Sequence, residues 1–177
     1  MAQISGLLCQ IVTGRLAGAG TDGSVYLGLG GREFHLDSTD DDYEQGSLRE
    51  YILGAPPIPF VSPPQIRVQN KDKNDPRKGF PLDTIDVDRT PVYIRFEPED
   101  EDDNWNLRFA ALLVYTNQFA IAYMTPQRFD NLWLGHGSGK ILYLTFEWRT
   151  DGPAGLNADA LSVLKVGRKL APRTRKR

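Results

Sequence analysis

Two dense groups of carboxylates are the residues of this sequence best suited to a definite chemistry, the binding of a divalent cation. Segment 37–42, DSTDDD, holds four carboxylates, and segment 97–103, EPEDEDD, holds six. Calcium takes about six to eight oxygen ligands in flexible geometry and favours carboxylates mixed with loop carbonyls. Water is the alternative, because acidic loops are often only solvated. No EF-hand is present, since no D-x-D-x-D-G loop is followed by its bidentate glutamate.

A third segment, GAGTDG at 18–23, has the G-x-G-x-x-G spacing of a dinucleotide-binding turn. That turn works only when a helix follows it, because the pyrophosphate sits on the amides of a helix N-terminus. The next residues, SVYLGLGG, alternate as a strand does and hold three glycines that disfavour a helix. We therefore expect no nucleotide here, and predict a tight loop between two strands with its carbonyls exposed.

The residues give no support for catalysis. His35 and His136 are the only histidines and lie far apart in the sequence, and no G-x-S-x-G element occurs. GHGSGK at 135–140 fails as a phosphate loop, because Leu134 stands at its first glycine position and Ile141 at its Ser/Thr position. With no nucleophile placed beside a base, we expect a protein that is not an enzyme.

The elements that would position the acidic loops are short strands separated by turn residues. Alternating apolar runs with few helical periods predict an all-β fold, a sandwich or barrel of antiparallel strands. The predicted strands are 7–13, 24–29, 33–36, 48–53, 65–69, 91–96, 107–115, 119–124 and 141–148.

Two segments interrupt this pattern. The segment APPIPFVSPP at 55–64 cannot be a central strand and continues into a polar loop, so 55–89 is predicted to be a Pro-rich insertion. Near the end of the chain, Asn157 is expected to cap a short helix over 158–166 that Gly167 ends. We therefore predict a sandwich over 1–150 and a C-terminal extension with a basic tail over 151–177.

The charge is distributed unevenly along the chain. Seven basic and no acidic residues lie from Lys165 onward, so residues 1–164 carry 14 basic against 23 acidic side chains. An acidic body with a basic tail can attract cations to the body and an anionic surface to the tail. The alternative for the tail is a solvated terminus. Neither a membrane span nor a signal peptide is visible, and we expect a cytoplasmic or peripheral membrane protein.

Several motifs together resemble the PLAT, or lipoxygenase-homology, domain found in lipoxygenases, animal lipases and bacterial toxins. The similar segments are IVTGRLAGAGTDGSVYLGLGG at 11–31, EFHLDSTDDDYEQGS at 33–47, VYIRFEPEDEDDNWNLRFAALLVY at 92–115 and, more weakly, FDNLWL at 129–134. They match a Gly-x-Gly-Thr-Asp loop, an x-Val-Tyr-Leu strand, an acidic turn and an Asp/Asn-Trp pair. The resemblance covers most of 4–149, apart from the insertion.

The resemblance implies an eight-stranded antiparallel β-sandwich with calcium held in loops at one end. By position, the implied ligands are loop oxygens or side chains of Ala19, Gly20, Thr21, Asp22, Asp37, Asp40, Asp42, Asp103 and Asn104. The sequence departs from the family pattern at Asp40, where members often carry glycine or a neutral residue, and EPEDEDD is unusually acidic. The added charge favours a cation but repels an anionic lipid when the metal is absent.

Two functions fit these features. The first is a non-enzymatic, calcium-dependent module that binds membrane lipid, with Ile58, Phe60 and Val61 of the insertion as apolar contacts. The second is a protein-interaction or assembly subunit, an adaptor or a homo-oligomer, that uses the same scaffold. No nucleotide or nucleic-acid partner is expected.

Overall fold

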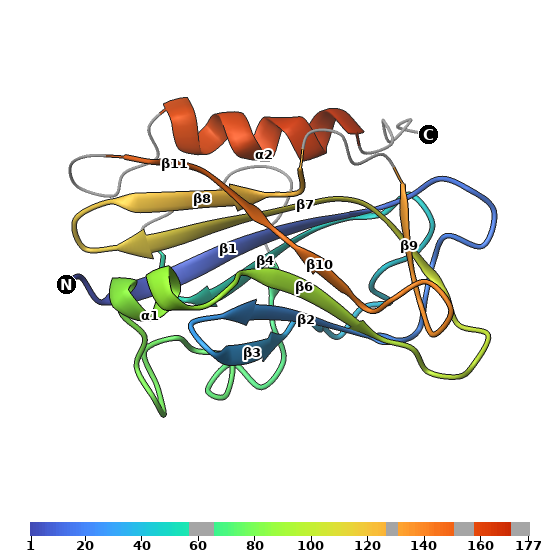
Figure 1. Ribbon diagram of the computed structural model, residues 1–177, viewed down its shortest axis with the longest axis horizontal. Helices are drawn as coiled ribbons and strands as arrows, with labels where there is room; N and C mark the ends of the chain where they lie inside the picture. Colours follow the sequence, from blue (N-terminus) through green and yellow to red (C-terminus); the bar gives the residue numbers. More distant parts are fainter. Residues whose placement is uncertain (57–65, 127–130, 151–157, 171–177) are drawn as a thin grey trace.

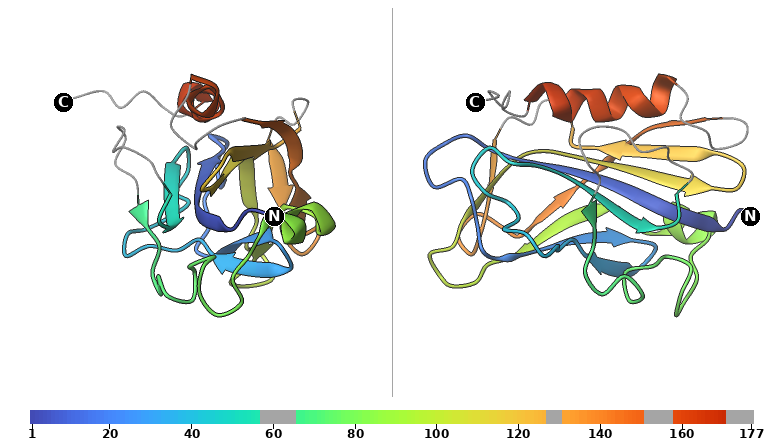
Figure 2. Two further views of the ribbon diagram at one scale, coloured as in Figure 1. Left: turned by 90° about the vertical axis from the view of Figure 1, so that its left-hand side faces the viewer. Right: turned by 180° about the vertical axis from the view of Figure 1, so that it is seen from behind.

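A computed structural model of the protein describes residues 1–56, 66–126, 131–150 and 158–170. These residues form two β-sheets that pack face to face, and a helix, α2 (Ala158–Leu170), covers the outer face of the larger sheet. Seen from the N-terminal end, the helix, the large sheet and the small sheet lie in successive layers (Figure 2). The prediction of an all-β sandwich with a C-terminal helix is confirmed.

The large sheet has seven strands within the described residues. Its order is β11 (Thr145–Arg149), β8 (Ala120–Met124), β7 (Trp105–Thr116), β1 (Ile4–Thr13), β4 (Leu48–Gly54) and β5 (Ile66–Arg67), and β9 (Leu132–Leu134) pairs with the beginning of β7. All neighbours are antiparallel except β4 and β5, which are parallel.

The small sheet has four strands in the part of the chain that is described. Its order is β10 (Ile141–Tyr143), β6 (Tyr93–Glu97), β2 (Ser24–Leu29) and β3 (Arg32–His35). A short helix, α1 (Thr84–Arg89), precedes β6 and is capped by Asp83 and Asp86, whose side chains and backbone amides bond reciprocally. β10 and β11 are nearly continuous, so the chain crosses from one sheet to the other (Figure 1).

Strand β1 is buried on both faces, which explains its continuous apolar run. Leu7, Cys9 and Ile11 contribute to the core between the two sheets. Leu8 and Val12 point the other way and pack in a second cluster with Val163 and Leu164 of α2. Because alternate residues of a strand face opposite sides, a strand covered on both sides is apolar at nearly every position.

Polar side chains fasten α2 to the large sheet beneath it. Arg168 binds the fully buried carboxylate of Glu50 with two hydrogen bonds of 2.8 and 2.9 Å. Gln10 donates to the same carboxylate at 2.7 Å and to the carbonyl of Leu164 at 3.1 Å. The helix is thus held by a buried charge pair as well as by apolar contacts.

The predicted end of this helix at 166 is wrong, because α2 continues through Gly167 to Leu170. A Cβ at Gly167 would lie 1.9 Å from Gln10 Oε1, so the absence of a side chain lets the helix approach β1 closely. Packing against the sheet outweighs the helix-ending tendency of glycine at this position. The structure also adds α1 and β9, which the sequence patterns did not predict.

The insertion contains regular structure where it is described. Residues 66–89 hold β5, α1 and the ordered loop between them, whereas 57–65 lie outside the described residues, and with them Ile58, Phe60 and Val61. Cys9 is a buried free cysteine, and burial raises the pKa of its thiol. No helix in the described part of the chain is long and apolar enough to cross a membrane.

Candidate functional site

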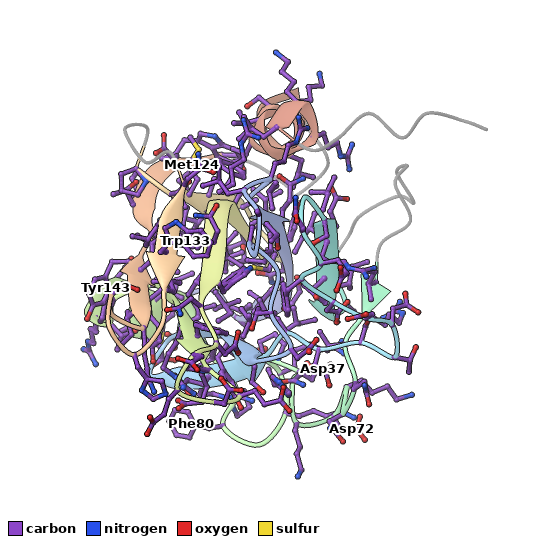
Figure 3. All side chains as sticks on the ribbon, turned by 90° about the vertical axis from the view of Figure 1, so that its right-hand side faces the viewer. Asp37, Asp72, Phe80, Met124, Trp133 and Tyr143 are labelled. Atoms are coloured by element: carbon purple, nitrogen blue, oxygen red, sulfur yellow. The ribbon has the colours of Figure 1, made fainter. Side chains whose placement is uncertain are left out.

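Three loops carry the predicted acidic residues, and they meet at one end of the sandwich. They are 14–23 between β1 and β2, 36–47 between β3 and β4, and 98–104 between β6 and β7. All three lie at the right-hand end in Figure 1, and Figure 3 looks onto that end. Antiparallel pairing brings loops from distant parts of the sequence together here.

The loops line a first acidic hollow of about 390 Å³ at the surface. It is lined by Gly20, Thr21, Asp22, Glu44, Glu99, Asp100, Asp102 and Asp103. Six of these eight residues are carboxylates, and none of the six forms an ion pair with another described residue. Their mutual repulsion is therefore left to solvent or to a bound cation.

Hydrogen bonds fix the backbone around the first acidic hollow. The Thr21 hydroxyl donates to the Asp103 carboxylate at 2.8 Å and accepts from the Gly23 amide at 2.8 Å. The Glu99 amide also donates to Asp103, at 2.9 Å. Asp103 thereby joins loop 98–104 to loop 14–23.

Asp22 differs from Asp103, because it is exposed and takes part in no side-chain hydrogen bond among the described residues. Its carboxylate is free to bind a ligand without a cost to the fold. Thr21 and Asp22 also line the second acidic hollow, of about 260 Å³, so this loop separates the two.

The side chain of Arg49 pairs with two carboxylates of the second acidic hollow. This hollow is lined by residues that include Asp37, Asp40, Asp41 and Asp42. Arg49 lies 3.2 Å from the carboxylate of Asp42 and 3.8 Å from that of Asp40.

Asp42 is mostly buried and also accepts from the Ser38 amide at 2.7 Å and the Ser38 hydroxyl at 2.9 Å. Its oxygens hold loop 36–47 in shape. The two hollows thus differ in charge balance, and the first has the greater excess of carboxylates.

Aromatic side chains support the loops from below. Trp105 is fully buried, with its ring centroid 5.4 Å from that of Tyr43 and 5.7 Å from that of Phe96, and its indole N–H donates to Thr13 at 3.2 Å. Tyr43 has φ 64° and donates its hydroxyl hydrogen to the carbonyl of Leu36. The acidic loops therefore rest on a rigid aromatic floor.

Gly20 lies where loops 14–23 and 36–47 approach each other, and a side chain at this position would need its neighbours to shift. A Cβ at Gly20 would lie 3.1 Å from the Gln45 amide nitrogen and 3.3 Å from the Tyr43 carbonyl oxygen. The glycine-rich spacing of 18–23 thus serves contact between loops 14–23 and 36–47.

The structure places the predicted ligands in three groups. Gly20, Thr21, Asp22 and Asp103 line the first acidic hollow, and Asp37, Asp40 and Asp42 line the second. Ala19 and Asn104 line neither hollow. The Ala19 carbonyl accepts from the Asn106 amide at 3.0 Å, and the Asn104 side chain donates to the Asp102 carbonyl at 2.8 Å.

Sequence reasoning singled out no role for Glu44, which lines the first acidic hollow, or for Arg49. Glu44 lies in the same DYEQGS turn as Asp42, and that turn was the available signal for it. Arg49 is seven residues beyond Asp42 on β4, and no motif indicates its pairing.

The donor chemistry suits a hard cation, since both hollows present carboxylate, hydroxyl and carbonyl oxygens. Within the described residues, however, no three carboxylate, histidine or cysteine side chains converge closely enough to hold a metal ion as they stand. Binding at the first acidic hollow would require exposed side chains such as Asp22 to turn inward.

Comparisons with known proteins address the fold. The chain is similar to the alpha toxin of Clostridium absonum, with a TM-score of 0.50 and 18% identity, over 81% of this chain and 32% of the toxin chain. A lipoxygenase variant, Delta413-417:GS LOX, aligns with a TM-score of 0.48 and 15% identity over 80% of this chain and 16% of the lipoxygenase chain.

This chain thus spans about a third of the toxin chain and less of the lipoxygenase chain. No protein-family model matches the sequence, and no curated protein matches it. The sandwich, its acidic loop end and the likeness to the toxin confirm the resemblance stated from the motifs: the chain has the PLAT, or lipoxygenase-homology, fold.

Proposed function

We propose that this protein is a non-enzymatic module that binds membrane lipid in a calcium-dependent manner through its acidic loop end. The observation that carries the proposal is the first acidic hollow, where six carboxylates from three loops gather without an ion-pair partner among the described residues. Calcium bound there would neutralise the repulsion that otherwise keeps an anionic lipid away.

Calcium would be held by Asp22, Asp103 and the oxygens of Gly20 and Thr21, with Asp100 as a further carboxylate. When bound, the ion supplies positive charge that can bridge these carboxylates to lipid phosphates. Loop 98–104 is already joined to loop 14–23 by the hydrogen bonds between Thr21 and Asp103, so calcium would not need to bring these two loops together.

Loop 14–23 also carries an exposed apolar residue. Leu16 is 47% exposed, and its carbonyl accepts from the Ala19 amide at 3.1 Å in a tight turn. An exposed leucine on a loop beside a charged hollow is suited to shallow insertion among acyl chains. The basic residues of the C-terminal segment other than Arg168, which is paired with Glu50, would add about 1 kcal/mol each at an anionic surface.

Sedimentation with vesicles of phosphatidylcholine and phosphatidylserine tests the proposal. We expect the wild-type protein to sediment with these vesicles in calcium and to remain in the supernatant with a chelator. Asp22→Asn should weaken the calcium-dependent binding about tenfold, because it removes an unpaired charge from the hollow.

Asp88→Asn is the matched control, since Asp88 is an exposed carboxylate on α1 that lines neither acidic hollow. It should bind as the wild type does. Equal sedimentation with calcium and with chelator would contradict the calcium step.

A further inference from the structure

We propose a second binding site, for a phosphate-type dianion, at the edge of the large sheet where β4 and β5 lie beside loop 69–82. A hollow of about 240 Å³ is found there. It is lined by Ile52, Gly54, Arg67, Val68, Lys71, Asp72, Asp75, Arg77 and Lys78. None of these residues lines either acidic hollow, and the inference does not rest on the proposed function.

The loop that forms one wall is fixed by Arg32 of β3. Its guanidinium donates to the carbonyls of Lys73, Asp75, Lys78 and Phe80 at 2.9 to 3.3 Å. One side chain thus satisfies four backbone acceptors. Such a loop has a defined conformation without belonging to a helix or strand.

Further contacts hold the loop against the sheets. Buried Asn74 accepts from the His35 amide at 2.9 Å and donates to the Gln69 carbonyl at 2.9 Å. A Cβ at Gly54 would lie 3.0 Å from Pro76 Cδ, so the loop packs directly on the end of β4. The basic side chains on this loop are therefore displayed from a rigid backbone, which lowers the entropy cost of binding.

The charges around the hollow do not cancel. Four cations face two carboxylates there. Arg77 binds Asp75 with hydrogen bonds of 2.9 and 2.7 Å, which lowers the pKa of that carboxyl, and Lys78 lies 2.6 Å from Asp72.

Both carboxylates are thus neutralised. Arg67 and Lys71 are the two cations of this hollow with no ion pair to a described residue. They leave an excess of two positive charges on a protein whose body is otherwise acidic.

This combination fits a phosphate dianion. Arg67 can offer a two-pronged set of N–H donors to a pair of phosphate oxygens, and Lys71 a point charge to a third. Ile52 and Val68 add apolar side chains to a lining that is otherwise mostly charged. In Figure 3, Asp72 marks this loop, below Asp37.

Calorimetric titration of the full chain with inorganic phosphate, in metal-free buffer, tests the site against sodium chloride at matched ionic strength. We expect saturable phosphate binding by the wild type. The double variant Arg67→Gln with Lys71→Gln should bind at least about tenfold more weakly.

Lys73→Gln is the matched control, because Lys73 is an exposed lysine of the same loop that does not line the hollow. It should bind phosphate as the wild type does. Unfolding midpoints in chloride confirm that all variants are folded. The proposal is overturned if the wild type shows no saturable binding, or if all three proteins respond equally.

Vesicles of phosphatidylcholine with phosphatidic acid, also without metal, identify the source of the phosphate. Weaker sedimentation of the double variant than of Lys73→Gln assigns the site to a lipid headgroup. Phosphate binding in solution with equal sedimentation of these two proteins assigns it to a soluble phosphate. Because no calcium is present, neither result depends on the acidic hollows.

Discussion

Arg168→Ala is expected to lower the free energy of unfolding by about 3–5 kcal/mol, because it leaves the buried Glu50 carboxylate without its charge partner. The Glu50 side chain is fully buried, and its one other hydrogen-bond donor is the neutral amide of Gln10 among the described residues. Urea denaturation followed by circular dichroism measures the change.

Lys169→Ala provides the control, since Lys169 is exposed on the same helix and has no ion pair with a described residue. Its effect should stay within about 0.5 kcal/mol, as for ordinary surface substitutions. Replacing both Glu50 and Arg168 by neutral residues, as in Glu50→Gln with Arg168→Met, should cost less than Arg168→Ala alone. Equal stabilities of Arg168→Ala and Lys169→Ala would refute the role of this pair.

Trp105→Ala is expected to cost about 3–5 kcal/mol of stability, the usual range for emptying a fully buried tryptophan site. The cavity would open beneath Tyr43 and Phe96, which support the acidic loops. We therefore expect a second effect, a loss of the calcium response even at temperatures where the variant remains folded. Thermal unfolding with and without calcium measures both.

Trp133→Ala is the control for removing a tryptophan elsewhere in the sandwich. Trp133 is only partly buried and lies on the short strand β9 (Figure 3). Its loss should destabilise the protein less and leave the calcium response in place. If Trp105→Ala kept a wild-type calcium response, the aromatic floor would not be needed to hold the loops.

Most of the sandwich could be predicted from local patterns. Period-two alternation identified the strands around Val25 and Ile94, and the PLAT motifs placed three distant loops at one end. The continuous apolar runs of β1 and β7 also held a signal for α2, because a strand that is apolar on both sides needs a cover on both sides.

Other features depend on tertiary contacts that sequence spacing does not reveal. Gly167 continues a helix because the helix must approach Gln10. Arg49 neutralises Asp42, and Arg32 organises loop 69–82, although neither arginine stands in a recognisable motif. Helix α1, by contrast, was predictable from the sequence. Asp83 and Asp86 form a capping box, and their spacing along the chain is the signal for it.

The same contacts refine the set of proposed ligands. Asp42 and Asp22 look equivalent in the sequence, yet Asp42 is bound by Ser38 and Arg49 whereas Asp22 is exposed and unbound in the described structure. We therefore propose the first acidic hollow as the calcium site, and propose that Asp42 instead holds loop 36–47 in shape.

Calorimetric titration of the full chain with calcium, without lipid, tests this assignment most directly. The account predicts saturable binding by the wild type and by Asp88→Asn, with a stability gain above about 1.4 kcal/mol once calcium exceeds its Kd tenfold. It predicts calcium binding about tenfold weaker in Asp22→Asn. No saturable binding by the wild type, or identical binding by Asp22→Asn, would contradict the account.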